Sequence, residues 1–205
     1  YQLYTHGEEA WVMEIIGRAQ AAGYNAFCLT VDTQVYSRRE RDLAKRYQPA
    51  AARRAGFAPA QTRPPTLQAS LSWELVRRIK DRFTIPLVLK GIACAEDAAL
   101  AVQNGVDIVY VSNHGGRQLD QGRGTLDMLP EVARAVGGRA KVVVDGGILR
   151  GTDVLKALAL GADAVGIGRM QGMALAAGGT AGVVRMLELL ETEIRTNLAL
   201  MGLSS

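Results

Sequence analysis

Residues 107–116 read DIVYVSNHGG, and this stretch contains the unit from which the whole chain is built. A short run rich in β-branched residues ends abruptly in polar residues and two glycines. The run is apolar at successive positions, which is typical of a strand that is covered on both faces. Comparable runs recur at 1–4, 26–32, 86–91, 141–147 and 162–168.

Amphipathic segments separate these runs, and several of them stop at glycine, as helices often do. They lie at 72–83, 95–105, 127–137 and 151–161. The alternation predicts an α/β protein with a parallel sheet. Its strands end near Asp32, Lys90, His114 and Asp145. A (β/α)8 barrel would gather these side chains at one mouth, whereas an open doubly wound sheet would spread them along an edge.

Only six strands are found, whereas a closed barrel of this kind has eight strands and typically ~250 residues. We therefore expect residues 1–205 to form a single domain, a (β/α)8 barrel that lacks its first two βα units. Residues 41–68 have no clean period and include QPAAARRAGFAPAQTRPPT. Insertions of this kind are usually lids or disordered segments, and we expect a lid, with plain disorder as the alternative.

The composition is that of an ordinary globular protein, with 48% hydrophobic residues, 21% charged residues and a net charge of +4. Basic residues gather mainly at 38–47 without interleaved aromatics, so we expect no nucleic-acid partner. Cys28 and Cys94 give no disulfide framework and no metal-ligand spacing. A soluble, cytoplasmic protein without a metal site is the expectation, and the apolar stripe at 183–201 is expected to pack against the core.

The residues at the strand ends suggest proton transfer beside an anion. His114 precedes two glycines, and its ordinary pKa near neutrality suits a general base, although it could also satisfy a loop carbonyl. Arg117, three residues later, offers a fork that matches a carboxylate, as does one of the pair Arg38 and Arg39. Lys90 could face an anion, and the glycine turns after the last two strands could cradle a phosphate or be ordinary turns.

Six motifs together resemble the FMN-dependent 2-hydroxy acid oxidase and dehydrogenase family, which includes glycolate oxidase, lactate oxidase and mandelate dehydrogenase. The resemblance runs from Tyr1 to about Met201 and is most specific in SNHGGRQLD combined with DGG and IGR. Its motifs are YQLY, LTVDT with RRE, LVLKGI, VSNHGGRQLD, VVVDGG, and RGTDVLKALALGADAVGIGR.

The resemblance implies a catalytic group and a substrate clamp. His114 is similar to the base that takes a proton from the substrate, and Asp32 to the carboxylate that stabilises its protonated form. Arg39 and Arg117 resemble the arginines that hold the substrate carboxylate, and Tyr4 resembles the tyrosine that hydrogen-bonds the substrate hydroxyl.

The resemblance also implies an FMN site. Its contacts with the isoalloxazine ring would come from Gln2, Thr30 and Ser112, with Lys90 beside the flavin N1 and C2 carbonyl. Its contacts with the ribityl chain and phosphate would come from Asp145, Gly147, Gly168 and Arg169.

The activity implied is oxidation of an (S)-2-hydroxy acid, such as lactate or glycolate, to the 2-oxo acid. Oxygen, a quinone or a cytochrome would reoxidise the flavin, and the family suggests a homotetramer. One departure bears on the phosphate: Leu149 stands where family members usually have arginine, and Arg150 could substitute for it or not.

Two other hypotheses remain. A truncated or degenerate paralogue could act as a non-catalytic binding or assembly module. Another FMN barrel enzyme, such as an isomerase of isoprenoid diphosphates, would not explain the paired arginines.

Overall fold

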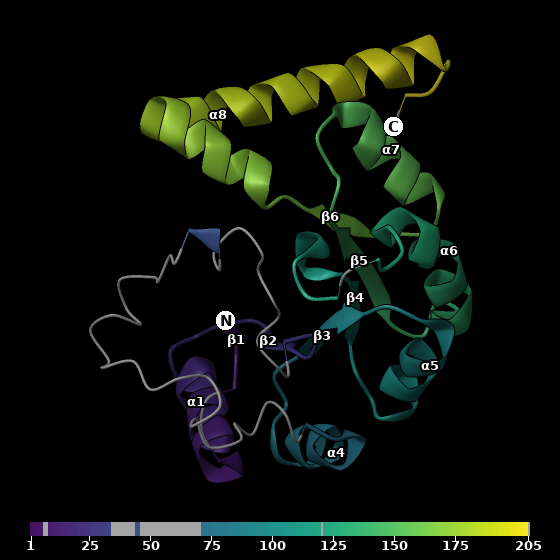
Figure 1. Cartoon of the computed structure of the whole chain (residues 1–205). Helices are drawn as coiled ribbons and strands as arrows, with labels where there is room; N and C mark the ends of the chain where they lie inside the picture. The colour runs from purple at the N-terminus through teal and green to yellow at the C-terminus, as the bar shows by residue number, and fades with distance from the viewer. Residues whose placement is uncertain (6–7, 34–43, 46–70, 120, 205) are drawn as a thin grey trace.

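The computed structural model describes residues 1–5, 8–33, 44–45, 71–119 and 121–204. Strands and helices alternate along the described chain (Figure 1). The strands are β1 (Gln2–Leu3), β2 (Phe27–Thr30), β3 (Leu87–Ile92), β4 (Ile108–Val111), β5 (Lys141–Asp145) and β6 (Ala164–Gly166). The helices are α1 (Glu9–Ala21), α4 (Trp73–Arg82), α5 (Ala95–Gln103), the short 3₁₀ helix η3 (His114–Gly116), α6 (Thr125–Val136), α7 (Gly151–Ala159) and α8 (Arg169–Leu200).

All six strands form one parallel sheet in the sequential order β1-β2-β3-β4-β5-β6. A doubly wound sheet reverses its strand order at a switch point, and no reversal occurs among the described strands. The sheet curls, and the helices cover its outer side (Figure 1). The fold is therefore an incomplete (β/α)8 barrel, which confirms the predicted class and the six strands.

The hydrophobic core lies between the sheet and the helices. Side chains alternate along each strand, so one set points outward to the helices and the other points into the curl. Leu87 and Leu89 on β3, and Val109 and Val111 on β4, are almost completely buried on the outer side. The inner set is more polar, and it includes Thr30, Lys90, Tyr110, Ser112 and Asp145.

The same hydrogen-bond arrangement occurs twice at the amino ends of the strands. The Asp107 carboxylate accepts from the backbone N–H of Leu87 at 2.7 Å, and the Asp163 carboxylate accepts from that of Val142 at 2.8 Å. Each aspartate also pairs with a lysine, Lys80 or Lys141. The sequences GVD and GAD therefore stabilise the end of the sheet opposite the polar strand ends.

Helix α8 is bent at Gly178 and Gly179, whose backbone angles are not helical, and its second half crosses α7 (Figure 1). Within 183–201 only Met186 and Leu190 are buried, while Val184, Leu187 and Leu189 are exposed. The expectation that this stripe packs against the core was therefore wrong for its exposed residues.

By length and composition α8 is also apolar enough to cross a membrane, with a mean hydropathy of 1.4 over an 18-residue window. Length and hydropathy alone are weak evidence for a membrane span, and only 11% of this window is buried among the described residues. Ion pairs such as Arg185–Glu188 and Arg195–Glu191 lie along the second half of α8, and the helix contacts α7.

The expected lid at 41–68 lies outside the described residues, apart from residues 44–45.

Gly151 at the start of α7 lets α8 approach closely. A Cβ at this position would lie 2.6 Å from the Glu193 Cβ and 2.8 Å from the Ile194 backbone nitrogen. We expect Gly151→Ala to lower the free energy of unfolding by about 1–3 kcal/mol, since overpacking of rigid backbone has that cost.

The measurement is chemical denaturation of the protein. Gly172→Ala is the matched control, because Gly172 lies in α8 with nothing within 4 Å of a Cβ. An alanine there should be neutral or stabilising, and equal losses in both variants would contradict the packing argument.

Candidate active site

Polar side chains meet where the strands end, on the inner face of the curled sheet. Thr30 pairs in register with Lys90, and Lys90 pairs with Tyr110. Thr30, Lys90 and Ser112 are at most 8% exposed although each is polar. Burying a polar side chain costs free energy unless hydrogen-bond partners satisfy it. The partners of these three residues therefore define the site.

The first group is formed by His114, Asp32 and Tyr4, which come from three different strand ends. His114 Nδ1 donates to the Asp32 carboxylate, at 3.1 Å from Oδ1 and 3.3 Å from Oδ2. The opposite ring nitrogen, Nε2, lies 3.4 Å from the Tyr4 hydroxyl. This arrangement fixes the tautomer of the imidazole and leaves Nε2 as the atom that can accept a proton.

The backbone around His114 is held in an uncommon conformation. His114, Gly115 and Gly116 have φ angles of 58°, 66° and 72°, all in the left-handed region that favours glycine. The His114 N–H donates to Ser112 Oγ at 3.1 Å, and the Gly116 N–H donates to Asn113 Oδ1 at 3.0 Å. These two side chains, both adjacent to the turn, stabilise the conformation that presents the imidazole.

Two further residues place Asp32. Gln118 Nε2 donates to the Asp32 backbone carbonyl at 2.9 Å, which ties the loop after β4 to the loop after β2. Gly91 has a φ of +115°, and a Cβ there would lie 2.5 Å from the Asp32 Cβ. The register of β3 and β4 shifts between Lys90 and Ile92 at this glycine. A bulge at Gly91 therefore makes the space that Asp32 occupies.

The second group surrounds Lys90. Its ammonium lies 2.8 Å from Ser112 Oγ, to which it donates, and 3.2 Å from Asp145 Oδ2. Asp145 Oδ1 is buried and has no hydrogen-bond partner within the described residues. Because a buried acceptor without a donor is costly, this oxygen is a place for a donor group of a bound molecule.

Gln2 extends the polar row to β1. Its Nε2 donates to Thr30 Oγ1 at 2.8 Å and lies 3.5 Å from the Tyr4 hydroxyl. Cys28 lies below Thr30 on the same face, and burial raises the pKa of its thiol to about 11. Cys28 is therefore a neutral apolar group at physiological pH and no nucleophile.

The two glycine turns differ in what their backbone can offer. At the start of α7 the N–H groups of Leu149 and Arg150 donate to Asp153 Oδ2, and that of Gly151 donates to Glu193. These donors are therefore already used by carboxylates. Arg150 donates to the same Glu193 at 2.7 Å, so its side chain is paired with a residue of α8.

The start of α8 offers a cation instead. Gly168 caps the helix, and Arg169 is exposed at its first turn. The Arg169 guanidinium lies against the loop that carries His114, since a Cβ on Gly115 would be 3.4 Å from its Nη2. A helix start with an adjacent arginine is suited to a phosphate group.

Taken together, these groups fit FMN. The unpartnered Asp145 Oδ1 suits a ribityl hydroxyl, the buried Lys90 suits a ring position that becomes negative, and Arg169 suits the phosphate. Among the described residues, no group of three or more His, Cys, Asp or Glu side chains could hold a metal ion.

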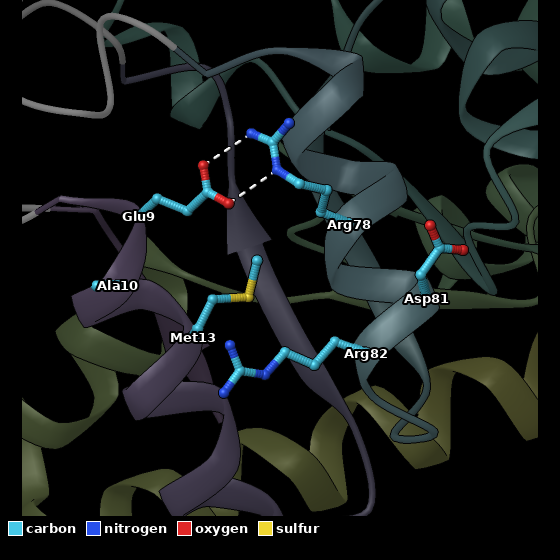
Figure 2. Close-up of a pocket in the computed structure, with 6 residues that line it drawn as sticks. All are labelled: Glu9, Ala10, Met13, Arg78, Asp81 and Arg82. Carbon is cyan, nitrogen blue, oxygen red and sulfur yellow. Dashed lines mark hydrogen bonds and ion pairs between the residues drawn. The ribbon is translucent and has the colours of Figure 1, made fainter.

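A surface hollow lies elsewhere, between α1 and α4, and has a volume of about 520 Å³. Figure 2 shows its lining, in which Arg78 binds both carboxylate oxygens of Glu9 at 2.8 and 2.7 Å. The hydrogen bond from Arg78 lowers the pKa of Glu9. This hollow is a contact between two helices on the outer side of the sheet, remote from the strand ends.

The structure thus brings together most of the residues expected from the sequence. His114, Asp32 and Tyr4 form one group, and Lys90, Ser112 and Asp145 form another, with Gln2 and Thr30 beside them. Arg117 is exposed on the loop after His114, and Gly147 follows Asp145. Arg39 lies outside the described residues.

Sequence reasoning missed the residues that position this site. They are Gly91, Asn113, Gln118 and Glu193. Only Gly91 carried a usable signal, because a glycine inside an apolar strand often marks a bulge.

Comparison with known proteins agrees with the geometry. The family model described as FMN-dependent dehydrogenase matches residues 1–205. An L-lactate oxidase from Nostoc sp. is 43% identical over 220 residues, and a peroxisomal (S)-2-hydroxy-acid oxidase from Oryza sativa subsp. japonica is 43% identical over 218. Each match covers 100% of this chain and 60% of the relative.

A crystal structure of mandelate oxidase with 3,3-difluoro-2-hydroxy-3-phenylpropionic acid superimposes with a TM-score of 0.86 at 41% identity. It covers 98% of this chain and 58% of that one. The chain therefore spans about three fifths of the length of the proteins that it matches.

Gly91→Ala tests whether the bulge positions Asp32. The added methyl group would overlap the Asp32 side chain and backbone nitrogen, so we expect turnover to fall by about 100-fold, as small misplacements of catalytic groups do. The measurement is kcat/KM together with the free energy of unfolding.

Gly138→Ala is the control, because Gly138 has a φ of +74° but no atom within 4 Å of a Cβ. It should cost about 1 kcal/mol of stability and leave turnover unchanged. If both variants lose the same turnover, backbone strain alone is responsible and the positioning role of Gly91 is wrong.

Proposed function

The chain belongs to the family of FMN-dependent dehydrogenases, and from that premise we propose that its protein oxidises an (S)-2-hydroxy acid to the 2-oxo acid with FMN. The observation that carries this proposal is the His114–Asp32 pair beside Tyr4 at the strand ends. The buried Lys90 within the same mouth provides further support.

The proposed reaction uses His114 as the base. Its Nε2 takes a proton from the substrate, and the imidazolium that forms is stabilised by Asp32 through Nδ1. Tyr4, whose hydroxyl lies 3.4 Å from Nε2, is proposed to hydrogen-bond the substrate hydroxyl. Arg117 and Arg39 are proposed to hold the substrate carboxylate, because a planar guanidinium binds both of its oxygens.

FMN, when bound, would accept the electron pair and the second hydrogen that the substrate loses. Gln2, Thr30 and Ser112 are proposed to line its ring, with Lys90 beside the part that becomes negative on reduction. Asp145 and Gly147 are proposed to hold the ribityl chain. Gly168 and Arg169 are proposed to bind the phosphate, since the backbone donors at the start of α7 already bind Asp153 and Glu193.

Oxygen is the proposed electron acceptor, because the relatives reported above are named oxidases; a quinone or a cytochrome is the alternative. A homo-oligomer is proposed on the family resemblance. A cytoplasmic location is proposed because the two cysteines, Cys28 and Cys94, form no disulfide framework. A non-catalytic module would have no use for the buried ammonium of Lys90, which is costly to keep without a function.

The test is reduction of the flavin by substrate without oxygen. We expect the full-length protein to purify yellow and to bleach anaerobically with L-lactate, glycolate or L-mandelate, and the colour to return in air. A protein that stays colourless after incubation with FMN would exclude the proposed function. A yellow protein that none of these acids bleaches would exclude the proposed substrate class.

Leu149→Arg tests the phosphate end. Leu149 is 58% exposed in the turn between β5 and α7, where Arg150 is already paired to Glu193. Because a charge-assisted contact with phosphate is worth about 1.5 kcal/mol or more, we expect the FMN dissociation constant to fall by about tenfold.

Leu158→Arg adds the same charge to an exposed position of α7 and should leave FMN affinity unchanged. Fluorescence titration of the apoprotein with FMN measures both variants. An unchanged affinity in Leu149→Arg would show that position 149 does not face the phosphate.

A further inference from the structure

Tyr110 lies on β4, two residues before Ser112, and belongs to none of the groups described so far. It is the β4 residue paired in register with Lys90, and it shares the inner face of the sheet with Ser112. The Lys90 ammonium lies 5.2 Å from the centroid of the Tyr110 ring. This distance is within the range of a cation–π interaction.

Lys90 is enclosed by three kinds of partner. Ser112 accepts a hydrogen bond from it, Asp145 balances its charge, and the Tyr110 ring supplies an apolar face with negative potential. The residue is only 8% exposed. A long flexible stem with a buried charge keeps one position only where its surroundings fill the other positions, and the ring occupies the space next to the ammonium.

Tyr110 is itself held in place from β6. A Cβ at Gly166 would overlap the Tyr110 hydroxyl and lie 3.1 Å from the Asp145 Cβ, so the absence of a side chain at 166 makes room for the tyrosine. Burial, and then the charge of Asp145, raise the pKa of Tyr110. A raised pKa means that the hydroxyl stays protonated at neutral pH, and so adds no second negative charge beside Lys90.

We propose that Tyr110 is a positioning residue, whose ring holds the Lys90 ammonium at the strand ends and so strengthens the stabilisation of negative charge on the bound flavin. The inference rests on the proposed function, because it requires FMN to lie beside Lys90. It goes beyond that function because it makes the stabilisation of negative charge by Lys90 depend on Tyr110, a residue that does not itself contact the flavin in the proposed site.

The experiment uses the full-length protein with FMN bound and sulfite as the probe. Sulfite adds to oxidised flavin to give an anionic adduct, so its dissociation constant reports how well negative charge on the ring is stabilised. The midpoint potential of the flavin is measured alongside, and FMN affinity and the free energy of unfolding are recorded for every variant.

We expect Tyr110→Leu to weaken sulfite binding by about three- to tenfold, which corresponds to the loss of one cation–π contact, and to make the midpoint potential more negative. Tyr110→Phe keeps the ring and should change the sulfite dissociation constant by less than about twofold. If Tyr110→Leu does not fold, Tyr110→Met replaces it as the variant without a ring.

Two controls separate this effect from packing and from the flavin site itself. Ile108→Ala removes volume from the same inner face of β4, two residues below, and should lower stability without changing sulfite binding. Lys90→Met removes the charge itself, and should weaken sulfite binding more than any variant of Tyr110.

The inference is overturned, and the proposed function kept, if Tyr110→Leu matches the wild type while Lys90→Met weakens sulfite binding. It is also overturned if Tyr110→Phe has the full effect of Tyr110→Leu, because the ring would then not be responsible. If the wild-type protein binds no FMN, the proposed function fails, and the inference fails with it.

Discussion

The in-register pairing of parallel strands is the constraint on which the site depends. Because β2, β3, β4 and β5 run in the same direction and pair without a reversal, their inner side chains stand in rows across the sheet. One row contains Thr30, Lys90 and Tyr110, and the polar strand ends lie just above it. A shift of one strand by a single residue would turn its inner side chains toward the helices, and the buried ammonium of Lys90 would lose its partners.

Much of the fold and of the site could be predicted from the sequence, since both depend on patterns that are local in the chain. Each apolar run marks a strand, and the polar residue behind it marks a strand end, which was sufficient to bring Asp32, Lys90, His114 and Asp145 to one mouth. The remaining contacts could not be read in this way, because they join residues far apart in sequence. Glu193 reaches Arg150 and Gly151 from α8, and Gln118 reaches the Asp32 carbonyl across 86 residues.

Long-range contacts also determine which residues are available for binding. Arg150 and the α7 backbone look like an anion site in the sequence RGTD, but Glu193 and Asp153 already accept their hydrogen bonds. Conversely, Tyr110 looks like one more strand residue in the sequence. The register of β3 and β4 places its ring beside Lys90, and its hydroxyl lies against Gly166 of β6. The exposed stripe of α8 has the same explanation, because periodicity shows that a helix has an apolar face and does not show what covers it.

The left-handed backbone of His114 has a consequence for how this protein can change. With a φ of 58°, a residue that has a Cβ costs about 1–2 kcal/mol relative to glycine at the same place. Substitution of His114 by glycine would relieve this strain, but it would also remove the imidazole and its contacts with Asp32 and Tyr4. The strained backbone at His114 is therefore kept together with contacts that only a side chain at this position can make.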